Sequence, residues 1–249
     1  MPRALRILIL LLILFVVGVM TLAEKYWVRT WTHPLHVAVY PIALDAESRD
    51  FVAGLAAEEF RDVGEFILRE SRHWGIKDVP APRIDLKAPI HDMPPLGHPT
   101  SKWEAIKLSL RLRWFAFRHT PFWQGLGTVR LFLLYHHAAP GEVLPHSLGL
   151  QKGLLGVVHL FFDARQHAQN NVVMTHELLH ALGATDKYDA NGMPIHPWGY
   201  ADPYAVPLLP QYQAEIMGGR VPVSETQAVI PSSLEKTVVG AATAAEIGW

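Results

Sequence analysis

The sequence predicts a mixed α/β domain, in the α+β sense of a twisted mixed sheet packed with helices, preceded by an apolar helix. Candidate strands and helices alternate along residues 31–182, which is typical of a layered α/β fold. Half of the 249 residues are hydrophobic, enough to bury one sizeable core. We therefore expect a signal anchor or signal peptide over residues 1–24 and one folded domain over residues 25–249.

The amino-terminal segment predicts a membrane-spanning helix or a secretion signal. Arg3 and Arg6 precede an uncharged apolar run, Ile7 to Ala23, whose length is at the lower limit for crossing a bilayer as a helix. The sequence Thr21-Leu22-Ala23 is a mediocre cleavage site, which favours an uncleaved anchor over a cleaved signal. We expect the domain in the cell envelope, anchored in the inner membrane and facing the periplasm or the exterior, or secreted if the segment is cleaved.

The first elements of the domain follow from hydrophobic periodicity. Alternation in residues 31–41 predicts a strand, and Asp45 then opens a helical pattern that continues to residue 76. Gly54 and Gly64 are positions where this helix can break or bend. Residues 79–99 are rich in proline and contain one short candidate strand, RIDLKAPI.

A second helix is expected from Ser101 to Phe117, and its charges are all basic apart from Glu104. Such a helix can rest on an anionic membrane surface near the anchor, or can simply present a solvated face. Strands are expected at Thr128–His137 and Gly153–Asp163. The second of these strands leads through a short loop into a helix that carries the main motif.

Charge and cysteine content limit the partners and the chemistry. The formal charge is −1 and the pI is about 6.9, so no excess of Lys and Arg is available for nucleic acid. There is no cysteine. The domain therefore forms no disulfides, and any metal site is built from His, Asp and Glu.

The motif is VVMTHELLHALGATDKYD, residues 172–189. His176 and His180 lie four residues apart, so a helix places both imidazoles on one face, where they can bind one ion. Glu177 lies one step around the helix, where it can reach a water molecule beside the metal. Gly183 can end the helix in a left-handed conformation, after which Asp186 can offer a carboxylate oxygen to the same ion.

The pattern HELLHALGATD resembles the aspartate-ligand branch of the zincin metallopeptidases, metzincin-like enzymes such as snapalysin and, more loosely, the immune-inhibitor type of secreted proteases. The resemblance runs from about Gly153 to the carboxyl end. Members carry a methionine turn (Met-turn) downstream of the motif, for which AEIMGG, residues 214–219, is the candidate. A terminal helix is also implied, with Ser232 or Ser233 as its N-cap. The resemblance implies one Zn²⁺ on His176, His180 and Asp186, with Glu177 as general base and Met217 as a hydrophobic floor.

Other residues near the motif have more than one interpretation. Asp189 can bind Ca²⁺ or cap the loop, although nothing else in the sequence supports calcium. His196 is the alternative third ligand, or a solvated loop histidine. Tyr188 can orient the loop by packing or donate to an oxyanion. The same alternatives hold for three further tyrosines, Tyr200, Tyr204 and Tyr212.

Histidines outside the motif are not expected to bind the metal. His136 and His137 are adjacent on a strand and face opposite ways, so they cannot easily share an ion. His159 is expected to be an edge or core histidine. The resemblance to zincins implies that the strand that contains His159 forms the edge of the cleft, where an extended peptide can pair with it. Gly153 and Gly156 either allow that close approach or relieve a bend.

The expected function is zinc-dependent hydrolysis of peptide bonds in peptide or protein substrates by an exported, membrane-anchored endopeptidase. Two alternatives remain: a non-catalytic zinc-binding module for envelope assembly or interaction, and a zinc amidase acting on cell-wall amides. Glu177 favours an enzyme, because a module that had lost catalysis could have lost this residue while keeping the ligands. The sequence does not determine the oligomeric state.

Overall fold

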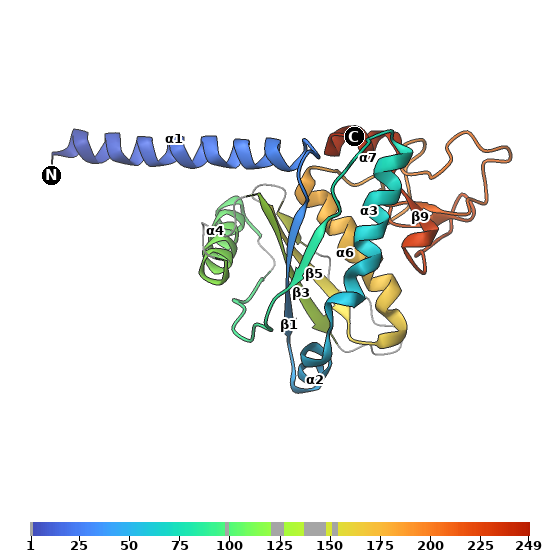
Figure 1. Ribbon diagram of the computed structural model, residues 1–249, viewed down its shortest axis with the longest axis horizontal. Coiled ribbons are helices and arrows are strands. Elements are labelled where there is room, and N and C mark those ends of the chain that lie inside the picture. The colour runs from blue at the N-terminus through green and yellow to red at the C-terminus, as the bar shows by residue number, and fades with distance from the viewer. Residues whose placement is uncertain (1, 98–99, 121–126, 137–147, 151–153) are drawn as a thin grey trace.

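The domain is built on one five-stranded sheet (Figure 1). The structure is a computed structural model that describes residues 2–97, 100–120, 127–136, 148–150 and 154–249. The strands lie in the order β2-β1-β3-β5-β4, and all pairs are parallel except the antiparallel β4–β5 pair at the edge. Their bounds are β1 His36–Ala43, β2 Arg83–Leu86, β3 Thr128–His136, β4 Leu148–Leu150 and β5 Leu155–Phe161. The predicted mixed α/β class is confirmed.

The central strands are apolar on both sides because helices cover both faces of the sheet. Val37 and Val39 of β1 pack in the cluster that includes the helices α3 and α6. Ala38 and Tyr40, which alternate with them, pack in a second cluster with α4. Strand alternation thus divides the core into two layers. The predicted strand ends His137 and Gly153 lie outside the described residues.

The helix predicted for residues 45–76 is divided. Asp45 caps α2 (Ala46–Gly54) by accepting a hydrogen bond from the Ser48 N–H at 2.7 Å. The chain turns extended at Leu55, and a single 3-10 turn, η1 (Ala57–Phe60), leads into α3 (Arg61–His73). The break after Gly54 lies at one of the two glycines where a break or bend was predicted. Gly64 stays inside α3.

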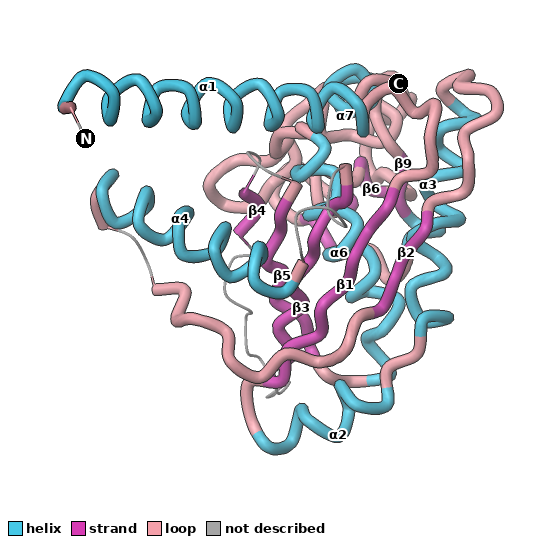
Figure 2. Tube along the Cα trace, turned by 60° about the vertical axis from the view of Figure 1, so that its left-hand side comes forward, coloured by secondary structure: helices cyan, strands magenta, loops and turns pink. Residues whose placement is uncertain are grey.

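Helix α4 (Lys102–His119) covers the other face of the sheet. Figure 2 shows it beside the strands and below the amino-terminal helix. The Ser101 side chain caps its first turn by accepting from the Glu104 N–H at 3.2 Å. Leu112, Phe115 and Ala116 are its buried residues.

The region after α6 is built from turns, short strand pairs and one short helix. The parallel pair joins β6 (Ala214–Glu215) to β9 (Thr237–Val238), and the antiparallel pair joins β7 (Val221–Pro222) to β8 (Ala228–Val229). A 3-10 turn, η3 (Leu234–Lys236), precedes β9, and Ser233 makes no side-chain cap there. The terminal helix α7 (Ala241–Ile247) begins after Gly240, so the predicted cap at Ser232 or Ser233 was wrong. Residues 237–238 pair with β6, which excludes helix at that point.

The amino-terminal helix α1 (Arg3–Val28) extends away from the domain (Figures 1 and 2). It is long and apolar enough to cross a membrane, and its apolar window is not buried against the protein. A signal sequence would have the same properties. The last turn of the helix reaches the domain, where Val28 is buried.

Candidate metal centre

The two histidines of the motif are presented by a deeply buried helix. Helix α6 (His167–Leu182) follows β5 through the short 3-10 turn η2 (Ala164–Gln166) and packs on the sheet. Leu178, Leu179 and Leu182 are almost completely buried, which fixes the rotation of the helix about its axis. His176 and His180 consequently project on one face, one turn apart.

The helix ends at a glycine whose conformation lets the chain return to that face. Gly183 has φ 116° and ψ 4°, in the left-handed region that side chains rarely adopt. The Gly183 N–H donates to the Leu179 carbonyl at 3.0 Å, and so does the Ala184 N–H at 2.9 Å. The chain then reverses and brings Asp186 over the two imidazoles.

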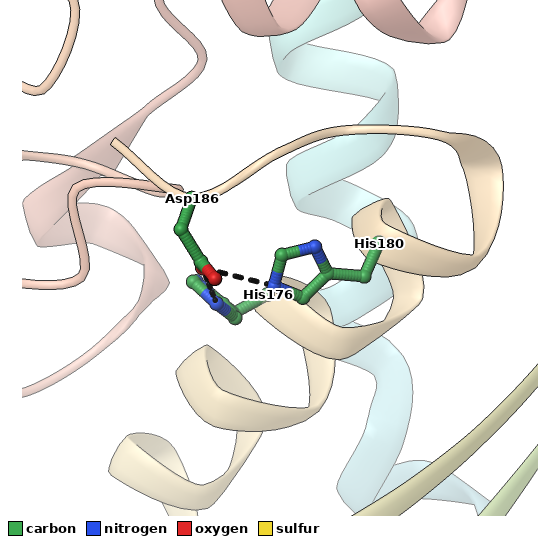
Figure 3. A group of neighbouring side chains, drawn as sticks. All are labelled: His176, His180 and Asp186. Carbon is green, nitrogen blue, oxygen red and sulfur yellow. Dashed lines mark ion pairs between the residues drawn. The ribbon is translucent and has the colours of Figure 1, made fainter. Parts of the chain in front are cut away.

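His176, His180 and Asp186 converge on one point (Figure 3). Asp186 Oδ1 lies 3.2 Å from His176 Nε2 and 3.0 Å from His180 Nε2. One ligand atom from each of the three residues lies within 4.8 Å of the others, so the group could hold a metal ion.

Backbone carbonyls set the protonation of both imidazoles. His176 Nδ1 lies 2.9 Å from the Ile216 carbonyl oxygen, and His180 Nδ1 lies 2.9 Å from the Ala184 carbonyl oxygen. Since a carbonyl only accepts, each Nδ1 must carry the proton and donate. In the neutral rings each Nε2 then directs a lone pair at the carboxylate oxygen of Asp186. Two lone pairs facing an anion require a proton or a cation between them, so the donor set fits a cation.

The charges of the cluster are strongly coupled. Burial opposes the charged form of Asp186, but hydrogen bonds and charge from His176 and His180 in their protonated form hold the pKa of the carboxyl far below its usual range. Burial likewise opposes the charged form of His180, yet Asp186 and Glu177 together raise the pKa of that imidazole. Positive charge at this point is therefore favoured.

Glu177 lies on α6 beside the cluster and is 6% exposed. Its Oε2 atom is buried and has no hydrogen-bond partner in the described part of the chain. Burial raises the pKa of this carboxyl, although the neighbouring imidazoles oppose that shift. An orphaned buried carboxyl oxygen is costly, which indicates a site that needs a further partner such as water or a substrate.

A carboxylate on α7 holds the loop that carries Asp186. Glu246 accepts from the Thr185 N–H at 2.8 Å and from the Thr185 hydroxyl at 2.7 Å. It also accepts from Lys187 Nζ at 2.8 Å. Both neighbours of Asp186 are thus fixed to the terminal helix. No spacing in the sequence links Glu246 to the motif, and sequence reasoning missed it.

Met217 is fully buried in the core cluster that contains α6. It lies in a turn where the N–H groups of Gly218 and Gly219 donate to the Glu215 carbonyl. The same turn supplies the Ile216 carbonyl that orients His176. The turn thus contacts the metal centre through backbone, while the Met217 side chain fills the core.

The Glu215 side chain stabilises this turn and was not predicted. This buried carboxylate accepts from the Gly218 N–H at 2.8 Å, the Gly240 N–H at 3.0 Å and the Thr243 hydroxyl at 2.7 Å. It therefore joins the turn to the start of α7.

The remaining sequence candidates have other environments. The Tyr188 ring stacks on His176 with 6.2 Å between ring centroids, and burial and the Asp186 charge raise its pKa. His196 is exposed, is not one of the three clustered residues, and has its Nε2 3.1 Å from the Pro203 carbonyl. Asp189 caps its own loop by accepting from the Asn191 and Met193 N–H groups.

The other tyrosines and histidines of the sequence analysis also lie in defined places. Tyr204 and Tyr212 are highly exposed, and Tyr200 packs edge-on against His196. His136 and His159 lie on adjacent strands, with Nε2 and Nδ1 2.7 Å apart. Burial, assisted by His136, lowers the pKa of His159 to about 4. The buried position of His159 agrees with its prediction as a core histidine.

A cavity of about 230 Å³ adjoins His176. Tyr188, Ile216 and the Arg220 side chain contribute to its lining, together with apolar residues of α6. Arg220 is exposed, and no ion pair or hydrogen bond joins its side chain to the described residues. The cavity is therefore apolar with one cation at its margin.

Strand β5, which was expected at the edge of the cleft and open to pairing with an extended peptide, is not an edge strand of the sheet. β4 pairs with it along Leu155–Val157, so the edge strand there is β4. At Gly156 an added Cβ would lie 2.8 Å from the Leu131 side chain on β3. A side chain at position 156 would therefore displace the end of the Leu131 side chain, and Gly153 lies outside the described residues.

A scan against protein-family models and a search of curated proteins found no match to this chain. The structure brings together His176, His180 and Asp186, with Glu177 and the Met217 turn beside them. It leaves His196 outside the group.

Proposed function

We propose that the chain is an exported, membrane-anchored zinc endopeptidase of the zincin type. The observation that carries the proposal is the convergence of two imidazoles and a carboxylate beside a buried glutamate with an unpartnered oxygen. Three protein ligands leave a position open, as catalytic zinc sites do, whereas structural sites are closed by four. The apolar helix α1 supports the membrane anchor.

Zinc is the metal that best fits the donor set. Bonds of 2.0–2.2 Å in tetrahedral geometry place neighbouring ligand atoms roughly 3.3 Å apart. The Nε2–Oδ1 distances of 3.2 Å and 3.0 Å are close to that value. Nitrogen and carboxylate ligands together, without sulfur, suit Zn²⁺ better than the all-oxygen preference of Ca²⁺ or Mg²⁺.

Each residue of the site can then have a separate role in amide hydrolysis. When bound, zinc would supply a Lewis acid that acidifies water and stabilises negative charge on the scissile carbonyl oxygen. Glu177 takes the proton from the attacking water and delivers it to the leaving amine. Burial favours the protonated form of Glu177 after the first transfer. Tyr188, whose ring stacks on His176, lies at the margin of the site and can donate to the same oxyanion.

The open position and Glu177 favour an enzyme over a non-catalytic zinc module. A module that uses the metal only for stability has no use for a buried carboxyl oxygen without a partner, because that atom lowers stability. A zinc amidase would need the same residues, so only its substrates distinguish it from an endopeptidase.

The test compares metal content and hydrolysis of quenched peptides for the full chain and three variants. We expect wild type to hold one zinc and to cleave, Glu177→Gln to hold zinc without cleaving, and Asp186→Ala to lose zinc. His196→Ala is the matched control, since this histidine lies outside the cluster, and it should keep both properties.

Other results would redirect or reject the proposal. Zinc without hydrolysis of peptides in wild type, combined with hydrolysis of muropeptide amides, would identify an amidase. Zinc with no hydrolysis of either class, unchanged by Glu177→Gln, would support the binding module. Full zinc content in Asp186→Ala would show that the third ligand is a different residue.

A further inference from the structure

Helix α4 presents an apolar stripe on its outer surface. Its members recur at intervals of three or four residues, so they lie along one face of the helix. Their exposed fractions are between 47% and 73%, although all are large. They are Trp103, Ile106, Leu110, Trp114 and Phe117.

This stripe is distinct from the face that packs on the sheet. Leu112, Phe115 and Ala116 are the buried residues of α4. With a rotation of about 100° per residue, they lie on the opposite side of the helix axis from the stripe. A helix needs only one apolar face to join a core. The second face is not part of the core and is left exposed, and within the described part of the chain only its last member, Phe117, shares a pocket with α1. A contiguous apolar surface of this kind marks an interaction site.

Basic residues border the stripe on both sides. They are Lys102, Lys107, Arg111, Arg113 and Arg118. Glu104, the acidic residue of the helix, is engaged by the Thr100 N–H at 2.8 Å and the Thr100 hydroxyl at 2.9 Å. The surface thus combines exposed tryptophan and aliphatic side chains with flanking cations, the composition of helices that lie in the interface of anionic membranes.

The position of α4 relative to α1 agrees with such an interface. Both helices lie on the same side of the domain, and α4 runs crosswise to α1, being seen nearly end-on in Figure 1 and lengthwise in Figure 2. They line a common pocket, in which Thr21 and Glu24 of α1 meet Ala116 and Phe117 of α4. The apolar run of α1 ends at Ala23, and Val17 and Met20 also line the pocket, so α4 adjoins the last two turns of that run, next to the point where a membrane-spanning helix leaves the hydrocarbon.

We propose that α4 lies flat in the interface of the membrane that α1 enters, with its apolar stripe among the outer parts of the acyl chains and its basic residues among anionic headgroups. The charge of the flanks and the adjoining membrane-spanning candidate favour lipid over a protein partner. Two contacts, α1 and α4, then hold the domain in one orientation. This inference does not depend on the proposed enzymatic activity.

The absence of cysteine allows a single label at each site of the full chain. Leu110→Cys places an environment-sensitive dye in the centre of the stripe, and Tyr204→Cys places it on a loop side chain that is 87% exposed. Both proteins are reconstituted in vesicles of phosphatidylcholine alone or with phosphatidylglycerol. In the anionic vesicles we expect the dye at position 110 to emit at shorter wavelength and iodide quenching to fall about threefold. The dye at position 204 should stay fully quenched.

A second comparison tests the charge. Lys107→Glu combined with Arg111→Glu, in the Leu110→Cys chain, should abolish the difference between the two lipid compositions. Both positions are exposed, and circular dichroism checks that the fold is retained.

Three results would overturn the proposal. Iodide could quench the dyes at positions 110 and 204 equally in both vesicles. Position 110 could be protected only in native membranes that contain other proteins, which would assign the stripe to a protein partner. Protection in detergent that rises with protein concentration would assign it to a second copy of the chain.

Discussion

At the scale of single residues, two backbone carbonyls orient the imidazoles of the candidate metal centre. The Ile216 and Ala184 oxygens each accept from an imidazole Nδ1, which leaves both Nε2 atoms directed at Asp186. Such outer contacts fix the tautomer and the orientation of a histidine ligand before the metal binds. The carboxylate ligand has its own support, because Glu246 holds Thr185 and Lys187 on either side of it.

Loss of the Glu246 carboxylate should weaken metal binding without removing a ligand. In Glu246→Ala the loop around Asp186 is free to move, and we expect zinc affinity to fall about 10–100-fold, as for other outer contacts of metal ligands. Competition with a fluorescent chelator measures the affinity. Glu235→Ala, at an exposed site of η3, is the control and should bind zinc like wild type. Equal affinities in the two variants would contradict a positioning role for Glu246.

Arg220 should set a charge preference if the site is a peptidase. Its guanidinium borders the cavity beside His176, so substrates with an acidic side chain near the scissile bond are favoured. We expect Arg220→Glu to lower kcat/KM for acidic peptides by about tenfold relative to neutral ones. Paired peptides that differ only in Glu and Gln measure this ratio. An unchanged ratio with normal zinc content would show that Arg220 does not contact the substrate.

At the scale of elements, hydrogen bonds between side chains and backbone join neighbouring helices and strands inside the core. Glu70 on α3 accepts from the Val239 N–H at 2.8 Å, and the Trp74 indole donates to the Val239 carbonyl at 2.9 Å. These bonds attach the carboxyl-terminal region to the helical layer. The imidazoles of His136 on β3 and His159 on β5 lie within hydrogen-bond distance of each other. Burial lowers the pKa of His159.

His159 should make the domain sensitive to acid. Burial lowers the pKa of His159 to about 4, whereas the unfolded chain binds the proton near 6.5. The unfolded state therefore binds more protons between these values, and the free energy of unfolding falls as pH decreases from about 6.5 to about 4. In His159→Phe this fall should be smaller.

Urea denaturation at pH 7 and pH 5 measures the difference for each protein. His73→Phe, which replaces an exposed histidine on α3, is the control and should show the wild-type decrease. The same decrease in His159→Phe as in wild type would contradict the assignment of this pH dependence to His159.

At the scale of the whole molecule, the candidate metal centre and the proposed membrane surface lie on opposite faces of the sheet. Helix α6 and the turns after it place the candidate metal centre on one side, whereas α4 lies on the other face, near α1 (Figures 1 and 2). The site and the proposed membrane surface are thus built by different layers. The last turn of α1 joins the domain itself, and the Trp31 indole next to it donates to the Ile247 carbonyl at 2.9 Å.

If α1 is the membrane anchor, removal of residues 2–22 should release the protein from the membrane without altering the candidate metal centre. We expect the shortened chain to bind as much zinc as the full chain and to bind phosphatidylglycerol vesicles weakly through α4, with binding reduced by about tenfold between low and physiological salt. Sedimentation with vesicles and metal analysis measure both properties. Binding that is equal for neutral and anionic vesicles would contradict the electrostatic part of this expectation.

The sequence alone determined the features that depend on local pattern. The alternation at β1, the apolar runs at β3 and β5 and the glycine that ends α6 could be read directly, because they reflect backbone geometry over a few residues. The spacing of His176, His180 and Asp186 predicted their meeting, since a helix turn and a reversal define it. The apolar segment that forms α1 was evident from composition.

Features that join distant segments became clear from the folded chain. Glu215 and Glu246 accept hydrogen bonds from residues that are far away in the chain. The edge strand beside β5 is β4. Helix α4 has two opposite apolar faces, and only one of them packs on the sheet. Periodicity does not tell this arrangement from a helix that is buried all round, because packing decides which face meets the sheet. Local pattern specifies the elements and the ligands, whereas burial and long-range hydrogen bonds depend on segments that meet only in the folded chain.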